Sequence, residues 1–141
     1  MTIEEKQNEI IKEFERFNDW DDKYAYLIKL GKELKPIPEE IKNDKFKLDG
    51  CQSQVWMNAK LEGDKMIIEG ESDAMIVKGL VALLLRVYSG RHPKEILSSP
   101  PVFLQKIGID SHLSPTRKNG LGAMLKQIQM FAIAFNTVLS K

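Results

Sequence analysis

Residues 46–68 carry the pattern that decides the fold, and they read FKLDGCQSQVWMNAKLEGDKMII. Phe46 and Leu48 alternate with charged residues, and a similar alternation of apolar and polar residues runs through residues 55–61. Residues 66–68 are apolar and follow the turn-forming run 62–65. Alternation with a period of two is typical of a strand that buries one face. The sequence therefore predicts a three-stranded antiparallel meander with one face toward the core.

Helical patterns flank this meander on both sides. Thr2 and Glu5 form a capping box before a first amphipathic helix, and Asp19 is placed to cap a second. Pro36 and Pro38 end the second helix, because proline cannot continue a helix. We expect an irregular connection over residues 35–44, a central buried helix over 74–88, one or two short helical turns over 96–107, and a last helix that Ser114 caps and Pro115 begins. The order of elements predicts an α+β fold with helices packed on one face of the small sheet.

Length and composition indicate an ordinary globular chain. The 141 residues are 43% hydrophobic and 29% charged, and we expect residues 1–141 to form a single domain. A formal net charge of +1 argues against nucleic acid as a partner. The longest apolar stretch, residues 74–88, contains Lys78 and Arg86 and is shorter than the roughly 20 residues that span a bilayer. With no signal peptide pattern in residues 1–18, we expect a cytoplasmic protein without a membrane partner.

The chain has one cysteine, Cys51, and its setting favours chemistry over packing. A single thiol forms no internal disulfide, and alone it does not hold zinc or an iron–sulfur cluster, so we expect no metal site. Gly50 before it leaves the backbone free to turn tightly, and the polar run 52–54 follows it. Cys51 thus lies in the connection between the first two predicted strands, where reactive groups are commonly placed. It is a candidate nucleophile or carrier of one sulfur atom.

Three stretches of the chain together resemble the SufE family of sulfur-acceptor proteins, which includes CsdE. They are GCQSQVW at residues 50–56, SDA at 72–74 followed by KG at 78–79, and HLSPTRKNGL at 112–121. Thr116 and Lys118 stand where serine is common in relatives. The resemblance runs from Trp20 to the last helix, and it implies a SufE/IscU-like fold.

The resemblance implies a function for Cys51. In this family the cysteine of the first stretch takes persulfide sulfur from a cysteine desulfurase of the SufS/CsdA type, stimulates that enzyme, and passes the sulfur to an iron–sulfur cluster scaffold of the SufB type. Pyridoxal phosphate belongs to the desulfurase, so no cofactor is expected on this chain. Cys51 would act through its persulfide and with a partner, rather than as an independent enzyme.

The matched stretches also supply supporting candidates, each with a structural alternative. Asp73 either caps the central helix or contacts the desulfurase, and Lys78 either extends to the surface or faces Cys51. His112 either satisfies backbone groups or shapes the surroundings of Cys51. Arg117 is a cation in the first turn of a helix, where the helix dipole disfavours it, which hints at an anion from elsewhere. Residues near the cysteine complete the candidates: Gly50 as a hinge, Gln52, and Gln54 with Trp56, which are expected to fix the connection to the sheet.

The thiolate is the reacting form of cysteine, and an unperturbed thiol with a pKa of about 8.5 is only a few per cent ionised at neutral pH. A nearby cation would lower that pKa. The candidates are His112, Arg117, Lys78 and Lys47, and the sequence does not choose among them.

Three other functions remain open. A thiol hydrolase or peroxidase would pair Cys51 with His112, although no local signature of such enzymes surrounds the cysteine. A zinc-dependent acceptor or a cluster scaffold would need several cysteines or a cysteine–histidine set, whereas this chain has one cysteine and two histidines. A pure adaptor would activate the desulfurase without accepting sulfur.

Overall fold

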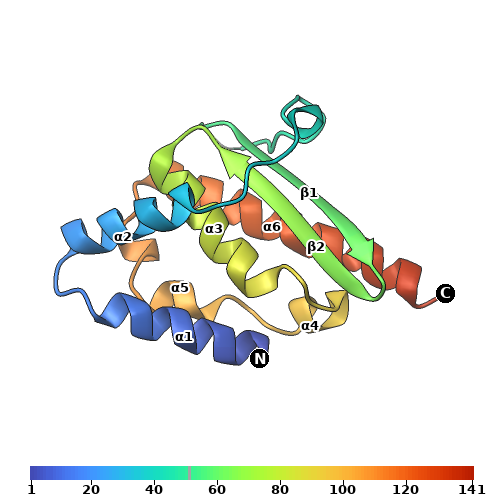
Figure 1. The fold of residues 1–141 in the computed structure, drawn as a ribbon, viewed down its shortest axis with the longest axis horizontal. Helices are drawn as coiled ribbons and strands as arrows, with labels where there is room; N and C mark the ends of the chain where they lie inside the picture. The colour runs from blue at the N-terminus through green and yellow to red at the C-terminus, as the bar shows by residue number, and fades with distance from the viewer. Residues whose placement is uncertain (51) are drawn as a thin grey trace.

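The computed structural model describes residues 1–50 and 52–141, and it shows an α+β arrangement around a central helix. A two-stranded ribbon lies on one side of this helix, α3, and the other helices surround it (Figure 1). The C-terminus lies beyond the tip of the β-hairpin, at the end of the longest helix. The elements are α1 (Ile3–Glu15), α2 (Trp20–Lys32), the 3-10 turn η1 (Glu39–Ile41), β1 (Val55–Glu62), β2 (Lys65–Ser72), α3 (Met75–Tyr88), α4 (Pro93–Leu97), α5 (Val102–Lys106), the 3-10 turn η2 (Asp110–His112) and α6 (Pro115–Leu139).

The sheet has two strands among the described residues, so the predicted third strand is wrong. β1 and β2 pair antiparallel through the expected turn, but residues 46–48 contribute only one bridge, between Lys47 and Trp56. A turn held by Asn43 precedes these residues, and Gly50 turns the chain just after them with a φ of 83°. Too few extended residues remain between the two turns to continue the ladder.

The helix boundaries follow the predicted local signals. Thr2 and Glu5 form the capping box of α1, and the Asp19 carboxylate accepts the Asp22 backbone N–H of α2 at 2.9 Å. Ser114 caps α6, whose first residue is Pro115. Of the short turns predicted over residues 96–107, α5 lies within that range, whereas α4 begins earlier, at Pro93, and ends at Leu97, before the two prolines that precede Val102. The connection after α2 is irregular as predicted, apart from the single turn η1.

The core forms around α3, which is apolar on most of its surface. Leu80, Leu84 and Val87 on this helix are completely buried. On its α2 side, Gly79 of α3 lies directly against the backbone of Leu27, and Gly31 lies against Gly79. These two glycines let the backbones of α2 and α3 approach closely. Buried apolar side chains from β1, β2 and α6 belong to the same core.

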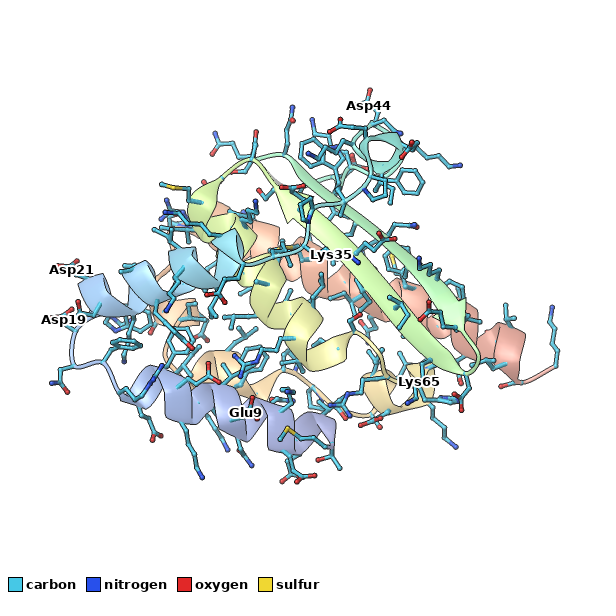
Figure 2. The ribbon with its side chains drawn as sticks, viewed as in Figure 1. Glu9, Asp19, Asp21, Lys35, Asp44 and Lys65 are labelled. Atoms are coloured by element: carbon cyan, nitrogen blue, oxygen red, sulfur yellow. The ribbon has the colours of Figure 1, made fainter. Side chains whose placement is uncertain are left out.

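A cluster of charges fastens α1 to the same central helix. The Arg86 guanidinium of α3 donates to Glu13 Oε1 at 2.8 Å and to Glu9 Oε1 at 2.5 Å, and Glu9 is labelled in Figure 2. Tyr26 of α2 also donates its hydroxyl to Glu13. The Arg86 contact is the largest cause that holds the pKa of Glu13 below its ordinary value, and burial opposes it. Three helices are therefore joined at one glutamate, Glu13.

The last helix is only partly covered by the core. Met124, Ile128 and Ala132 on α6 are buried, whereas Met130 and Ile133 are more than half exposed. No helix among residues 1–50 and 52–141 combines the length and the apolar character needed to cross a bilayer.

Candidate functional site

The connection that contains the single cysteine emerges at the end of the sheet where β1 begins and β2 ends (Figure 1). We call residues 42–54 the cysteine loop. Asp44 lies at its outer tip (Figure 2). Gly50, a predicted hinge, has a positive φ of 83° that other residues adopt only with strain, and Gln52 on the other side of Cys51 is exposed. Cys51 itself lies outside the described residues.

Asp73 fastens the end of the cysteine loop to the end of β2. Its carboxylate accepts the Gln54 backbone N–H at 3.0 Å, and its own N–H donates to the Gln54 carbonyl at 3.3 Å. The Ser72 hydroxyl donates to the same carbonyl at 2.8 Å. The prediction that Asp73 caps the central helix is wrong, because the N-cap of α3 is Ala74, without a side-chain cap. The acceptor that could have capped α3 is used to hold the loop.

Arg117 lies beside Gln52, another candidate site residue, which belongs to the cysteine loop. Both line a small hollow of about 20 Å³, together with Ser53 and with residues of α3 and α6. Among the described residues, no carboxylate forms an ion pair with Arg117. Ser114 accepts its backbone N–H at 3.3 Å, so Arg117 lies in the capped first turn of α6. This corner is suited to an anion by charge.

Lys78 and His112 are held by other partners. The Lys78 ammonium lies 3.1 Å from Glu71 Oε1 on β2. The His112 ring stacks on Trp20 with centroids 3.8 Å apart, and its Nδ1 lies 2.9 Å from the Gly108 carbonyl. A carbonyl only accepts, so this contact places the ring proton on Nδ1. The geometry thus gives Lys78 and His112 structural contacts with β2 and α2.

Lys47, the remaining candidate cation, has an exposed side chain, and its backbone bridges Trp56. Trp56 and Gln54 thus both join the cysteine loop to the sheet, as expected from the sequence. The described residues contain no group of three or more histidine and acidic side chains able to hold a metal ion.

Sequence reasoning missed one group of charges next to the loop. Lys42, at the start of the loop, lies 3.3 Å from Glu71 Oε2 and 3.6 Å from Glu39 Oε1. Glu71 in turn pairs with Lys78. In the sequence, Glu71 is a glutamate at an outward-facing strand position. An ordinary solvated residue has the same pattern, so the sequence does not reveal these ion pairs.

Comparisons with known proteins identify the family of this chain. Residues 8–132 match the family SufE, described as an Fe-S metabolism associated domain. An uncharacterized SufE-like protein of Rhizobium meliloti (strain 1021) is 41% identical over 128 residues, which cover 86% of this chain and 91% of the relative. A SufE-like protein of Synechocystis sp. is 42% identical over 126 residues, 89% of this chain and 79% of that relative. The chain therefore belongs to the SufE family.

A solved structure supports the same fold. The solution structure of a hypothetical protein from Thermus thermophilus superposes with a TM-score of 0.77 and covers 94% of this chain and 96% of that one. At 23% sequence identity this likeness establishes the fold alone. The family places the chain in Fe-S metabolism.

Proposed function

We propose that the chain is a sulfur acceptor that takes persulfide sulfur from a cysteine desulfurase onto Cys51. The observation that carries this proposal is the position of the only cysteine, inside the stretch that resembles the SufE family. Its two neighbours in the sequence, Gly50 and Gln52, differ in their structural surroundings. Gly50 turns the chain before it, and Gln52 after it lines the hollow beside Arg117. Pyridoxal phosphate would remain with the desulfurase, and the partner would be of the SufS/CsdA type.

The transfer step is the persulfide analogue of thiol–disulfide exchange. The thiolate of Cys51 attacks the outer sulfur of the persulfide on the desulfurase cysteine. A new S–S bond forms on Cys51, the S–S bond of the desulfurase breaks, and the desulfurase thiolate leaves. The charge therefore moves from the attacking thiolate to the leaving thiolate, and no external oxidant or reductant is needed.

Arg117 fits the electrostatic needs of this step. The incoming persulfide and the product on Cys51 are both anionic at neutral pH, and Arg117 has no carboxylate partner among the described residues. A guanidinium near these sulfur atoms would stabilise the anion and favour the thiolate over the thiol. The persulfide would then pass to a cluster scaffold of the SufB type, in the reducing cytoplasm where a lone thiol stays free.

The proposal is tested by adding wild-type protein or Cys51→Ser to a cysteine desulfurase and following alanine release together with sulfur bound to the added protein. A carrier predicts that wild-type protein raises turnover and retains sulfur, and that Cys51→Ser does neither. If Cys51→Ser stimulates as well as wild type and neither protein binds sulfur, the chain is an adaptor and the proposed transfer is refuted.

A further inference from the structure

Three consecutive residues at the end of β2 hold both ends of the cysteine loop. Ser72 and Asp73 hold Gln54, the last residue of the loop, through its carbonyl and its N–H. Glu71 holds Lys42, the first residue of the loop, with 3.3 Å between Nζ and Oε2. The two ends of the loop therefore meet on one short segment of backbone.

The Glu71 carboxylate divides its two oxygens between two elements. Oε1 pairs with Lys78 of α3 at 3.1 Å. Oε2 is buried and accepts no hydrogen bond among the described residues, so its ion pair with Lys42 at 3.3 Å is the contact that offsets its burial. Only 13% of the Glu71 side chain is exposed, so solvent screens these pairs less than ordinary surface pairs. Burial raises the pKa of Glu71, but the two lysines lower it further, and the net pKa lies below the ordinary value. Glu71 is therefore charged at neutral pH, and its loss leaves two cations without this partner.

The middle of the cysteine loop is fastened at the same level of the sheet. Lys47 bridges Trp56, and Trp56 is the cross-strand partner of Glu71. Lys42, Lys47 and Gln54, at the start, middle and end of the loop, thus all attach at or next to the cross-strand pair of Trp56 and Glu71. The first and last residues of the loop are held differently. Hydrogen bonds to backbone groups hold Gln54, whereas an ion pair between long side chains holds Lys42.

From this arrangement we infer that Glu71 is a positioning residue for Cys51: by holding Lys42 against β2 and α3, it fixes the start of the cysteine loop and so restricts the positions of the thiol. Glu71 touches no reacting atom in this account. The role in sulfur acceptance rests on the proposed function, whereas the positioning of the thiol can be measured without any desulfurase.

The experiment compares Glu71→Gln, which keeps the shape of the side chain and removes its charge, with Lys42→Met, which releases only the start of the loop. Glu69→Gln is the matched control, because Glu69 lies two residues earlier on the same face of β2 and forms no ion pair among the described residues. The first measurement is the rate at which iodoacetamide alkylates Cys51. The second is the KM and kcat of sulfur acceptance from a desulfurase.

We expect Glu71→Gln and Lys42→Met each to speed alkylation at least threefold, because a freed loop opens more often. The double variant should add little to Glu71→Gln, since both act through one contact. We expect KM for the acceptor to rise severalfold with kcat little changed, because a docked desulfurase holds the loop in place of Lys42. Glu69→Gln should leave these values unchanged.

The signs separate positioning from a simple effect of charge on the thiol. Removing an anion at Glu71 and removing a cation at Lys42 would shift the pKa of Cys51 in opposite directions, whereas a freed loop speeds alkylation in both variants. Opposite shifts, or unchanged alkylation in a folded Lys42→Met protein, would overturn the inference. If Glu71→Gln fails to fold, Lys42→Met alone decides. A wild-type protein that accepts no sulfur would refute the proposed function, and the alkylation rates would still judge the positioning.

Discussion

The close crossing of α2 and α3 makes Gly79→Ala the most informative test of the fold. A Cβ at Gly79 would lie 2.3 Å from the Leu27 carbonyl oxygen and 2.7 Å from Leu27 Cγ, whereas ordinary contacts begin near 3.4 Å. The nearest atom belongs to the backbone, so no change of rotamer relieves the clash. The two helices must move apart by about 1 Å, and this movement loosens the core around the completely buried Leu80.

Two opposing terms set the size of the effect. Overpacking a core costs about 1–3 kcal/mol, and a clash between two backbones takes the upper end of that range. Replacing glycine by alanine inside a helix returns about 1 kcal/mol through helix propensity. We therefore expect Gly79→Ala to lower the free energy of unfolding by about 2 kcal/mol. For a domain of this size that corresponds to a fall in Tm of about 8 °C.

The assay is urea unfolding followed by far-UV circular dichroism, with Gly122→Ala as the control. Gly122 lies in α6, is exposed, and has no atom within 4 Å of an added Cβ. At Gly122 only the difference in helix propensity acts, so the free energy of unfolding of the control should rise by about 0.5–1 kcal/mol. A Gly79→Ala protein as stable as the Gly122→Ala protein would refute the close crossing of the two helices.

Two further predictions concern the charged contacts. Arg86→Met should lower stability at neutral pH by about 1 kcal/mol, because the partly exposed pair with Glu13 lies nearer to surface pairs than to fully buried ones. Because the pKa of Glu13 is lowered, this contact adds to the free energy of unfolding above pH 4.5, the ordinary pKa, and the contribution is lost as the pH falls through the pKa of the folded state. The urea midpoints of wild type and Arg86→Met should therefore converge in acid. A difference between the two midpoints that is unchanged at low pH would contradict this. Asp73→Ala removes the acceptor at the end of the cysteine loop, and alkylation of Cys51 should rise severalfold, whereas Asp49→Ala in the same loop should leave it near the wild-type rate; equal rates in the two variants would show that the Asp73 contact does not restrain the thiol.

The sequence predicted those features whose partners are close along the chain. The Thr2 and Glu5 capping box is confirmed because both partners lie within one helical turn. The Asp73 cap was wrong because its acceptor is used by Gln54, 19 residues away, through a strand pairing that no local pattern shows. The third strand was wrong because alternation over residues 46–48 is too short to show that turns enclose it on both sides.

Ion pairs between distant elements could not be predicted at all. Arg86 and Glu13 are 73 residues apart, and charged residues at such separations pair only once the helices have packed. The same is true of Lys42 and Glu71. Glu13, Lys42 and Glu71 have the sequence signal of solvated surface residues, and Arg86 is a charge within an apolar stretch, so only the folded structure shows which partners they hold.

Two residues of the family motifs have direct structural explanations in this chain. Gly79, in the second matched stretch, permits the crossing of α2 and α3. Asp73, in the same stretch, holds the cysteine loop. The stretches that resemble the family thus include residues that build the scaffold as well as Cys51, the residue proposed to carry sulfur.

The central claim is that Cys51 carries sulfur, and non-reducing mass spectrometry tests it most directly. The protein is mixed with a cysteine desulfurase and free cysteine, and the peptide that contains Cys51 is then weighed. The account predicts one added sulfur atom on this peptide when the desulfurase is present and none when it is omitted. An unmodified Cys51 peptide, from a mixture in which the desulfurase itself is shown to carry persulfide, would contradict the account.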